Sequence, residues 1–177
     1  MAELAKLLQS MEYVSNDLVR NAVDEGDEEK RAVIRKRIYA VEEEIHHLID
    51  SETLEEEEGT LTHYFSTGVY ARELLIPADT IMTSKLHKLP RLCIISKGDV
   101  TFTTETGTRR IKAPYTAVFP PGSKVALYTH EDTVWTAIHG TDETDLDKLE
   151  SDLIAKDHAE YFEFKKSLLL GKQEIHQ

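Results

Sequence analysis

Cysteine is almost absent from this chain of 177 residues, since Cys93 is the only one. An intramolecular disulfide is therefore excluded, and so are metal sites built from several thiolates. No activating partner for Cys93 is visible in the sequence. We expect it to be a small buried apolar side chain and not a nucleophile.

Positive charge is also scarce. The chain has 21 Lys and Arg residues but 33 Asp and Glu residues, which gives a net charge of -12. An acidic chain is repelled by phosphate backbones, so general nucleic-acid binding is not expected. No apolar run approaches the roughly 20 residues of a membrane helix. The first residues lack the charged-then-apolar pattern of a signal peptide. We therefore expect a cytoplasmic protein without a membrane partner.

The common catalytic and nucleotide-binding motifs are missing as well. The sequence contains no P-loop, no G-x-G-x-x-G, no G-x-S-x-G and no H-E-x-x-H. What is present is enough chain for one domain with a real core and some appendages. The features that indicate its function are the spacing and the charge of its residues.

Two segments near the N-terminus have the apolar spacing of amphipathic helices, at 4–22 and 34–48. The turn signal at 24–27 favours an antiparallel helical hairpin. Two interpretations stay open. The helices pack on each other or on the rest of the domain, or the hairpin joins copies of the chain. An acidic run at 55–58 is expected to be a solvated linker, so 1–58 forms a first unit.

From residue 61 to residue 139 the pattern changes to short alternating runs separated by turns. Many short strands at this spacing predict a mainly β fold, an antiparallel jelly-roll barrel over 59–140. After Gly140, stripes of leucine and aromatic residues predict two short helices outside the barrel, in a third unit at 141–177. Strands are predicted at 69–76, 92–96, 100–104, 109–112, 116–119, 124–129 and 133–139.

Two motifs in the middle of the chain resemble those of the cupin superfamily. The first has the spacing Lys85-x-His87-x3-Arg91-x6-Gly98, and the second contains a Pro-x-Gly turn at 120–122. The family motifs are G-x5-H-x-H-x3-E-x6-G and G-x5-P-x-G-x2-H-x3-N. The resemblance implies a jelly-roll barrel with a site in its interior. Short elements at 97–99, 113–114, 120–122 and 130–135 also resemble small single-domain cupin-like proteins of tailed bacteriophages, which implies a phage origin.

Most of the family's metal ligands are replaced in this sequence. His87 matches the second histidine of the first motif, but Lys85 replaces the first histidine and Arg91 the glutamate. Lysine and arginine are cationic at neutral pH and do not bind a metal cation. We therefore expect no bound cofactor. The alternative is a divalent transition metal held by a rearranged set of His87, His130, Glu131 and His139.

The same replacements predict a cationic pocket. Lys85, His87 and Arg91 on one inward face would bind an anion, since the arginine fork suits carboxylate or phosphate. The other open interpretation is an internal network in which Glu73, Glu131 or Asp132 neutralises these charges. Trp135 belongs either to the core or to the ligand site. The candidate ligand-binding residues are Lys85, His87, Arg91, His130, Trp135 and His139, and no catalytic residue is assigned.

The sequence thus favours a non-enzymatic protein that binds a small anionic molecule, such as a nucleotide or sugar phosphate. In a phage it would sequester a host signalling molecule in the host cytoplasm. One alternative is a metal-dependent enzyme of the dioxygenase or isomerase type, and another is a phage structural or assembly protein. Exposed apolar helix stripes predict a homo-oligomer, most simply a dimer.

Overall fold

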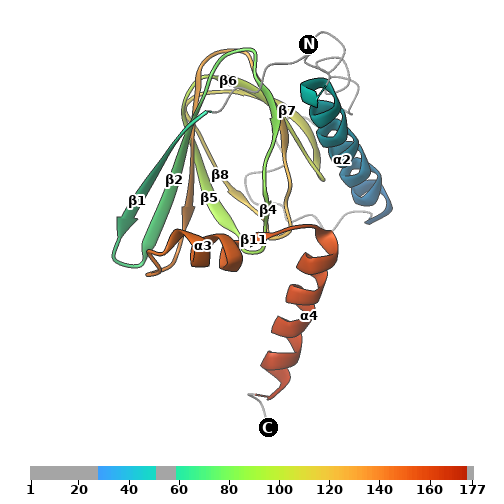
Figure 1. Ribbon diagram of the computed structural model, residues 1–177, viewed down its shortest axis with the longest axis vertical. Coiled ribbons are helices and arrows are strands. Elements are labelled where there is room, and N and C mark those ends of the chain that lie inside the picture. The colour runs from blue at the N-terminus through green and yellow to red at the C-terminus, as the bar shows by residue number, and fades with distance from the viewer. Residues whose placement is uncertain (1–27, 51–58, 175–177) are drawn as a thin grey trace.

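Two antiparallel sheets face each other and form a jelly-roll barrel in the computed structural model (Figure 1). The structure describes residues 28–50 and 59–174, so the predicted helix at 4–22 and the acidic run at 55–58 lie outside it. One sheet has the strand order β1-β2-β10-β5-β8 and the other β3-β9-β6-β7, while β11 pairs with β4. The strands are β1 (Thr60–Ser66), β2 (Val69–Ile76), β3 (Ile81–Thr83), β4 (Leu86–His87), β5 (Arg91–Lys97), β6 (Asp99–Thr104), β7 (Gly107–Lys112), β8 (Tyr115–Phe119), β9 (Ala126–Thr129), β10 (Thr133–His139) and β11 (Ile154–Ala155). The helices are α2 (Glu28–Asp50), α3 (Leu146–Leu153) and α4 (His158–Glu174).

The mainly β jelly roll predicted from the sequence is confirmed. Strands β2 and β10 begin and end at the predicted residues. Each of the other predicted strands differs by one or two residues at one or both ends. The sequence did not predict β1, β3, β4 or β11. Strand β1 lies at a sheet edge with both faces largely exposed, so it lacks a clear alternation. The other three are only two or three residues long.

The barrel interior is apolar over much of its length. Alternate residues point inward, as in β5, where Cys93 and Ile95 are buried and their neighbours are more exposed. Each fully buried large side chain contributes about 1.5–3 kcal/mol to stability. Cys93 is buried in this core, as predicted. The cluster consists of Ile76, Cys93, Ile95, Val100, Phe102, Ile111, Phe119, Val125, Leu127 and Ala137.

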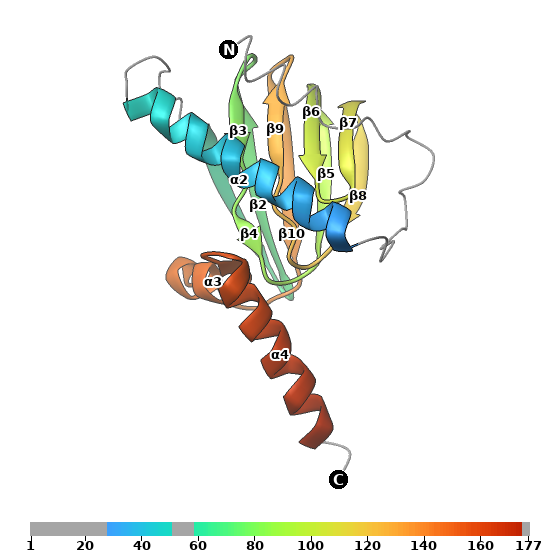
Figure 2. The ribbon, with the colours of Figure 1, turned by 90° about the vertical axis from the view of Figure 1, so that its right-hand side faces the viewer.

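Helix α2 crosses the outer face of the four-stranded sheet (Figure 2). Ile38, Val41 and Ile45 form its buried stripe and pack with Ile81 and Ala126 of the sheet. The predicted helix at 34–48 is therefore confirmed, and it packs on the barrel. The interpretation as an oligomerising hairpin depends on residues outside the described ranges.

One buried carboxylate joins helices α2 and α4 to the barrel. Glu105, at the tip of the β6–β7 hairpin, accepts hydrogen bonds from Arg31 and Arg35 of α2 and pairs with His158 of α4. Burial alone would raise the pKa of Glu105. The hydrogen bonds from His158 and Arg35, with the charges of both arginines, instead lower this pKa to about 2. Glu105 is therefore ionised at neutral pH and links three elements.

The C-terminal segment covers one end of the barrel before it leaves the body. Asp145 caps α3 by accepting from the backbone N–H groups of Asp147 and Lys148. Leu149 and Leu153 of α3 pack on Tyr70 of β2. Strand β11 pairs with β4, and α4 then projects away from the barrel (Figure 1). These elements confirm the two helices predicted after Gly140. Within the described ranges, no helix is long and apolar enough to cross a membrane.

Candidate functional site

Three polar side chains are buried together at the end of the barrel that α3 and β11 cover. They are His87 of β4, Arg91 of β5 and His139 of β10, with 6%, 4% and 3% of their surfaces exposed. Arg91 and His139 are the inward members of their strands' alternation, since Leu92 beside Arg91 and Ile138 beside His139 are more exposed. His87 belongs to a two-residue strand in which both side chains are buried. We call these three residues the histidine–arginine cluster.

The two imidazole rings of the cluster stack on each other. The ring centroids of His87 and His139 lie 5.4 Å apart with an angle of 14° between the planes. Within the described part of the chain, Nδ1 of His87 and both ring nitrogens of His139 have no hydrogen-bond partner. Buried polar atoms are rarely left without a partner, so these three nitrogens are an exception within the barrel.

Both histidines are neutral at physiological pH. Burial, followed by the charge of Arg91, lowers the pKa of His87 to about 2. The same two causes, with the charge of Arg72, lower the pKa of His139 to about 4. The positive charge of the cluster therefore comes from Arg91, with Arg72 of β2 nearby.

Arg91 is a buried cation without a carboxylate partner among the described residues. Its Nη1 donates to Ser123 Oγ at 3.0 Å, and its guanidinium carbon lies 5.2 Å from the ring centroid of Phe119. Burial lowers its pKa, although arginine stays protonated in proteins. A buried charge is costly unless an opposite charge neutralises it. Among the described residues, hydrogen bonding to Ser123 and the contact with Phe119 offset part of this cost without an opposite charge.

The acids proposed from the sequence as internal partners lie elsewhere. Glu73 accepts from Tyr64 and Thr136 on the outside of the five-stranded sheet. Glu131 pairs with Lys112, and Asp132 pairs with Lys97, all on the surface. The internal network of Glu73, Glu131 or Asp132, which the sequence left open as the alternative, is therefore not formed around Arg91.

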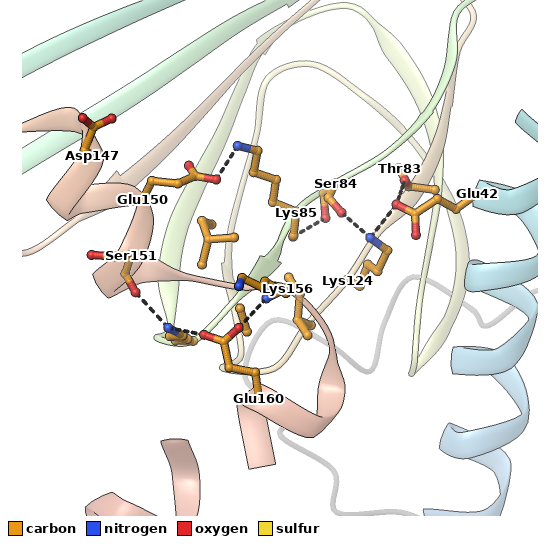
Figure 3. A pocket seen from close by; sticks show the side chains of 14 residues that line it. Glu42, Thr83, Ser84, Lys85, Lys124, Asp147, Glu150, Ser151, Lys156 and Glu160 are labelled. Atoms are coloured by element: carbon orange, nitrogen blue, oxygen red, sulfur yellow. Dashed lines mark hydrogen bonds and ion pairs between the residues drawn. The ribbon is translucent and has the colours of Figure 1, made fainter. Parts of the chain in front are cut away.

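Lys85 does not join His87 and Arg91, which corrects the prediction that all three share one inward face. It is 49% exposed and forms an ion pair with Glu150 of α3. Figure 3 shows this pair in a groove of about 700 Å³ between the barrel, α3 and α4. Lys85 lies in the irregular link between β3 and β4, where the alternation of a continuous strand does not apply.

His130 and Trp135 are also separate from the cluster. His130 lies in the turn between β9 and β10 and shares a hydrogen bond with Thr101. Trp135 belongs to the apolar core, with its ring centroid 5.7 Å from that of Phe102 and 5.6 Å from that of Phe119. The core interpretation of Trp135 is therefore the correct one.

The alternative metal set is divided between the two ends of the barrel. His130 and Glu131 precede β10 and His139 ends it, and seven residues of strand span about 20 Å. Within the described ranges, no group of three or more His, Cys, Asp or Glu side chains could hold a metal ion. Two imidazoles beside an arginine do not fit the three or four ligands that a transition metal needs.

The sequence did not predict one buried cation outside the cluster. Arg109 is buried on β7 opposite Phe102, and its Nη2 has no partner among the described residues. The signal was available, because Arg109 lies two residues before the core residue Ile111 and alternation places both on one face.

The barrel is similar to several solved structures at low sequence identity. KdgF from Halomonas sp. gives a TM-score of 0.44 at 11% identity, over 54% of this chain and 89% of that chain. A salicylate 1,2-dioxygenase from Pseudaminobacter salicylatoxidans gives 0.46 at 9%, over 62% and 34%. A cupin-domain protein from Bordetella pertussis gives 0.40 at 13%, over 50% and 98%.

No protein-family model matches the chain, and no curated protein matches it. At these identities and TM-scores, the solved structures give no argument about ligand or activity. The jelly-roll fold that the cupin resemblance implied is confirmed by the barrel itself. The bacteriophage origin stays a prediction.

Proposed function

We propose that this protein binds a small anionic molecule at the histidine–arginine cluster and catalyses no reaction on it. One observation carries the proposal: Arg91 is buried, and no carboxylate of the described residues neutralises it. An anionic ligand would supply the missing charge and remove the cost of burying the guanidinium. The nearby Arg72 adds to the same field.

The unpaired nitrogens define what the ligand must offer. A neutral imidazole has one N–H donor and one acceptor nitrogen, and an arginine only donates. The ligand therefore needs an oxyanion for Arg91 and a hydroxyl group within reach of the histidines. A sugar phosphate or a nucleotide carries both. In a bacteriophage, such a protein would sequester a host signalling molecule of this class.

The apolar core limits how deeply the ligand enters. Phe119 contacts the Arg91 guanidinium, and Trp135 packs against Phe119 on the core side. The space beyond the cluster is thus filled by side chains, and only a phosphate or carboxylate head group is expected to be buried. The rest of the ligand would lie toward α3 and β11, which cover this end of the barrel.

Calorimetry with inorganic phosphate, glucose 6-phosphate and AMP tests the proposal. Arg91→Gln should weaken binding of the best of these probes by about 2–5 kcal/mol, because a desolvated charge pair is lost. Lys97→Gln is the matched control and should bind as wild type does, since Lys97 lies at the opposite end of β5 from Arg91 and pairs with Asp132 on the surface. The proposal fails if none of the three probes binds, or if the Lys97 variant is weakened as much as the Arg91 variant.

Stability without ligand gives a second measurement. Arg91→Gln should leave the melting temperature unchanged or raise it, because it removes a buried charge that lacks a partner. A large loss of stability would mean that the charge is neutralised within the protein, and the anion would then not be needed.

The rival function is a metal-dependent enzyme. Its support is limited to the adjacent neutral imidazoles of His87 and His139 with unpaired nitrogens, which are fewer than the three ligands that a transition metal needs. Elemental analysis of the purified protein separates the two functions. A stoichiometric transition metal that is lost in His87→Ala would replace the binding proposal with the enzyme.

A further inference from the structure

The outer face of the five-stranded sheet carries an apolar row that crosses every strand. Its members are paired across neighbouring strands of the sheet. Along the row, Tyr64 pairs with Ala71, Ala71 with Ile138, Ile138 with Leu92, and Leu92 with Val118. Val118 is 64% exposed and Tyr64 is 50% exposed. Helix α2 covers the four-stranded sheet instead (Figure 2), so the described helices leave this row open.

Charge is nearly absent from the same face. Charged residues make up 31% of the chain, yet Glu73 is the only charged side chain at the outward positions between the strand ends of this fully described sheet. It accepts hydrogen bonds from Tyr64 and Thr136. The other outward positions are apolar, serine or threonine. A face of this composition is unusual for a strongly acidic molecule and is typical of an interface.

We propose that this face binds a second copy of the chain, with a two-fold axis running along β10. Strand β10 is the middle strand of the five, and Ile138 is the middle of the row. About that axis, Leu92 faces Ala71 of the partner subunit, and Val118 faces Tyr64 of the partner subunit. Large side chains thus meet smaller ones on both sides of Ile138, and the face is complementary to itself, as a two-fold interface requires.

Size and charge both favour a second copy as the occupant. Five strands about 4.8 Å apart and seven residues long at about 3.3 Å each give a face of about 24 by 23 Å. Two such faces cover about 1,100 Å², above the roughly 1,000 Å² expected of a specific interface. Copies with a net charge of -12 repel each other least where they meet over an uncharged face. A surface of anionic lipids would need lysines or arginines around the row instead.

The mass in solution tests the dimer. Light scattering on the full chain at micromolar concentration should give twice the single-chain mass of 20.2 kDa. Val118→Lys should reduce the mass to that of one chain, with an unchanged circular dichroism spectrum. Val33→Lys is the control, because Val33 is an exposed apolar residue on α2 and away from the row. A single-chain mass for wild type, or a dimer that survives Val118→Lys, overturns the proposal.

Crosslinking tests the axis itself. A mixture of Val118→Cys and Tyr64→Cys chains should form a disulfide-linked dimer with a mild oxidant. Each variant alone should not, because the axis places like positions at opposite edges of the interface. The native Cys93 is buried and does not interfere. Crosslinking of either variant alone, or no crosslinking in the mixture, would rule out this axis.

Discussion

The imidazole rings of His87 and His139 lie face to face, 5.4 Å apart between centroids, although the two residues come from β4 and β10. Neither ring can be protonated easily, because burial and then the charge of Arg91 lower both pKa values. A stacked pair of neutral rings beside a buried arginine is a polar site inside an otherwise apolar barrel.

Stability should fall as the pH is lowered from 7 to 5. The pKa values of His87 and His139 are about 2 and about 4 in the folded state, against 6.5 for an unperturbed histidine. Below pH 6.5 the unfolded chain therefore binds protons that the folded chain does not, and each histidine costs on the order of 2 kcal/mol at pH 5. Urea denaturation at several pH values measures the slope. It should be much smaller in a His87→Asn, His139→Asn double variant.

Between pH 7 and pH 5 the stability changes through these histidines and not through Glu105. Glu105 has a pKa of about 2 in the fold, lower than the ordinary glutamate value of 4.5, so its contribution is lost only below about pH 4.5. An equal pH slope in wild type and the double variant between pH 7 and 5 would show that the two rings do not titrate as described.

Glu105→Gln should lower the stability of the protein by weakening the packing of α2 and α4 on the barrel. The carboxylate binds Arg31 and Arg35 of α2 and His158 of α4, and all of these contacts are largely buried. Removing one charge of a buried pair costs about 3–5 kcal/mol, which urea denaturation would measure.

Glu150→Gln is the matched control for Glu105. Glu150 also pairs with a cation, Lys85, but both side chains are about half exposed. Exposed pairs contribute about 0–1 kcal/mol, so this variant should be close to wild type. Equal losses in the two variants would contradict the special role of Glu105.

Gly122→Ala should destabilise the protein more than Gly68→Ala. Both glycines have positive φ angles, 75° and 71°, so an alanine costs about 1–2 kcal/mol in either. A Cβ at Gly122 would lie 2.4 Å from the ring of Tyr161, whereas a Cβ at Gly68 meets nothing within 4 Å. Thermal denaturation should therefore show an additional loss of about 1–3 kcal/mol for Gly122→Ala. Similar losses would mean that α4 moves away without cost.

Cys93 should be inert to thiol reagents in the native protein. Burial raises its pKa, so little thiolate forms at neutral pH. Reaction with a chromogenic disulfide reagent should be complete in concentrated guanidinium and negligible in buffer. Fast labelling of the native chain would show that the barrel core opens readily.

The alternating apolar pattern of 69–76, 92–96 and 133–139 was sufficient to predict strands, because a strand with one buried face must repeat every two residues. The periodicity of 34–48 predicted α2 for the corresponding reason in helices. The edge strand β1 was missed because neither of its faces is well buried.

The sequence by itself determined the jelly-roll class and the placement of helices around the barrel, since these follow from periodicity within single strands and helices. The inward positions of His87 and Arg91 were implied by the spacing of the cupin-like motif, because no strand was predicted at His87. Only the tertiary structure decided which inward residues meet. It places His139 against His87, keeps His130 at the far end of β10 and turns Lys85 outward to Glu150. Contacts between strands depend on sheet order and on irregular links, and local sequence patterns do not encode either.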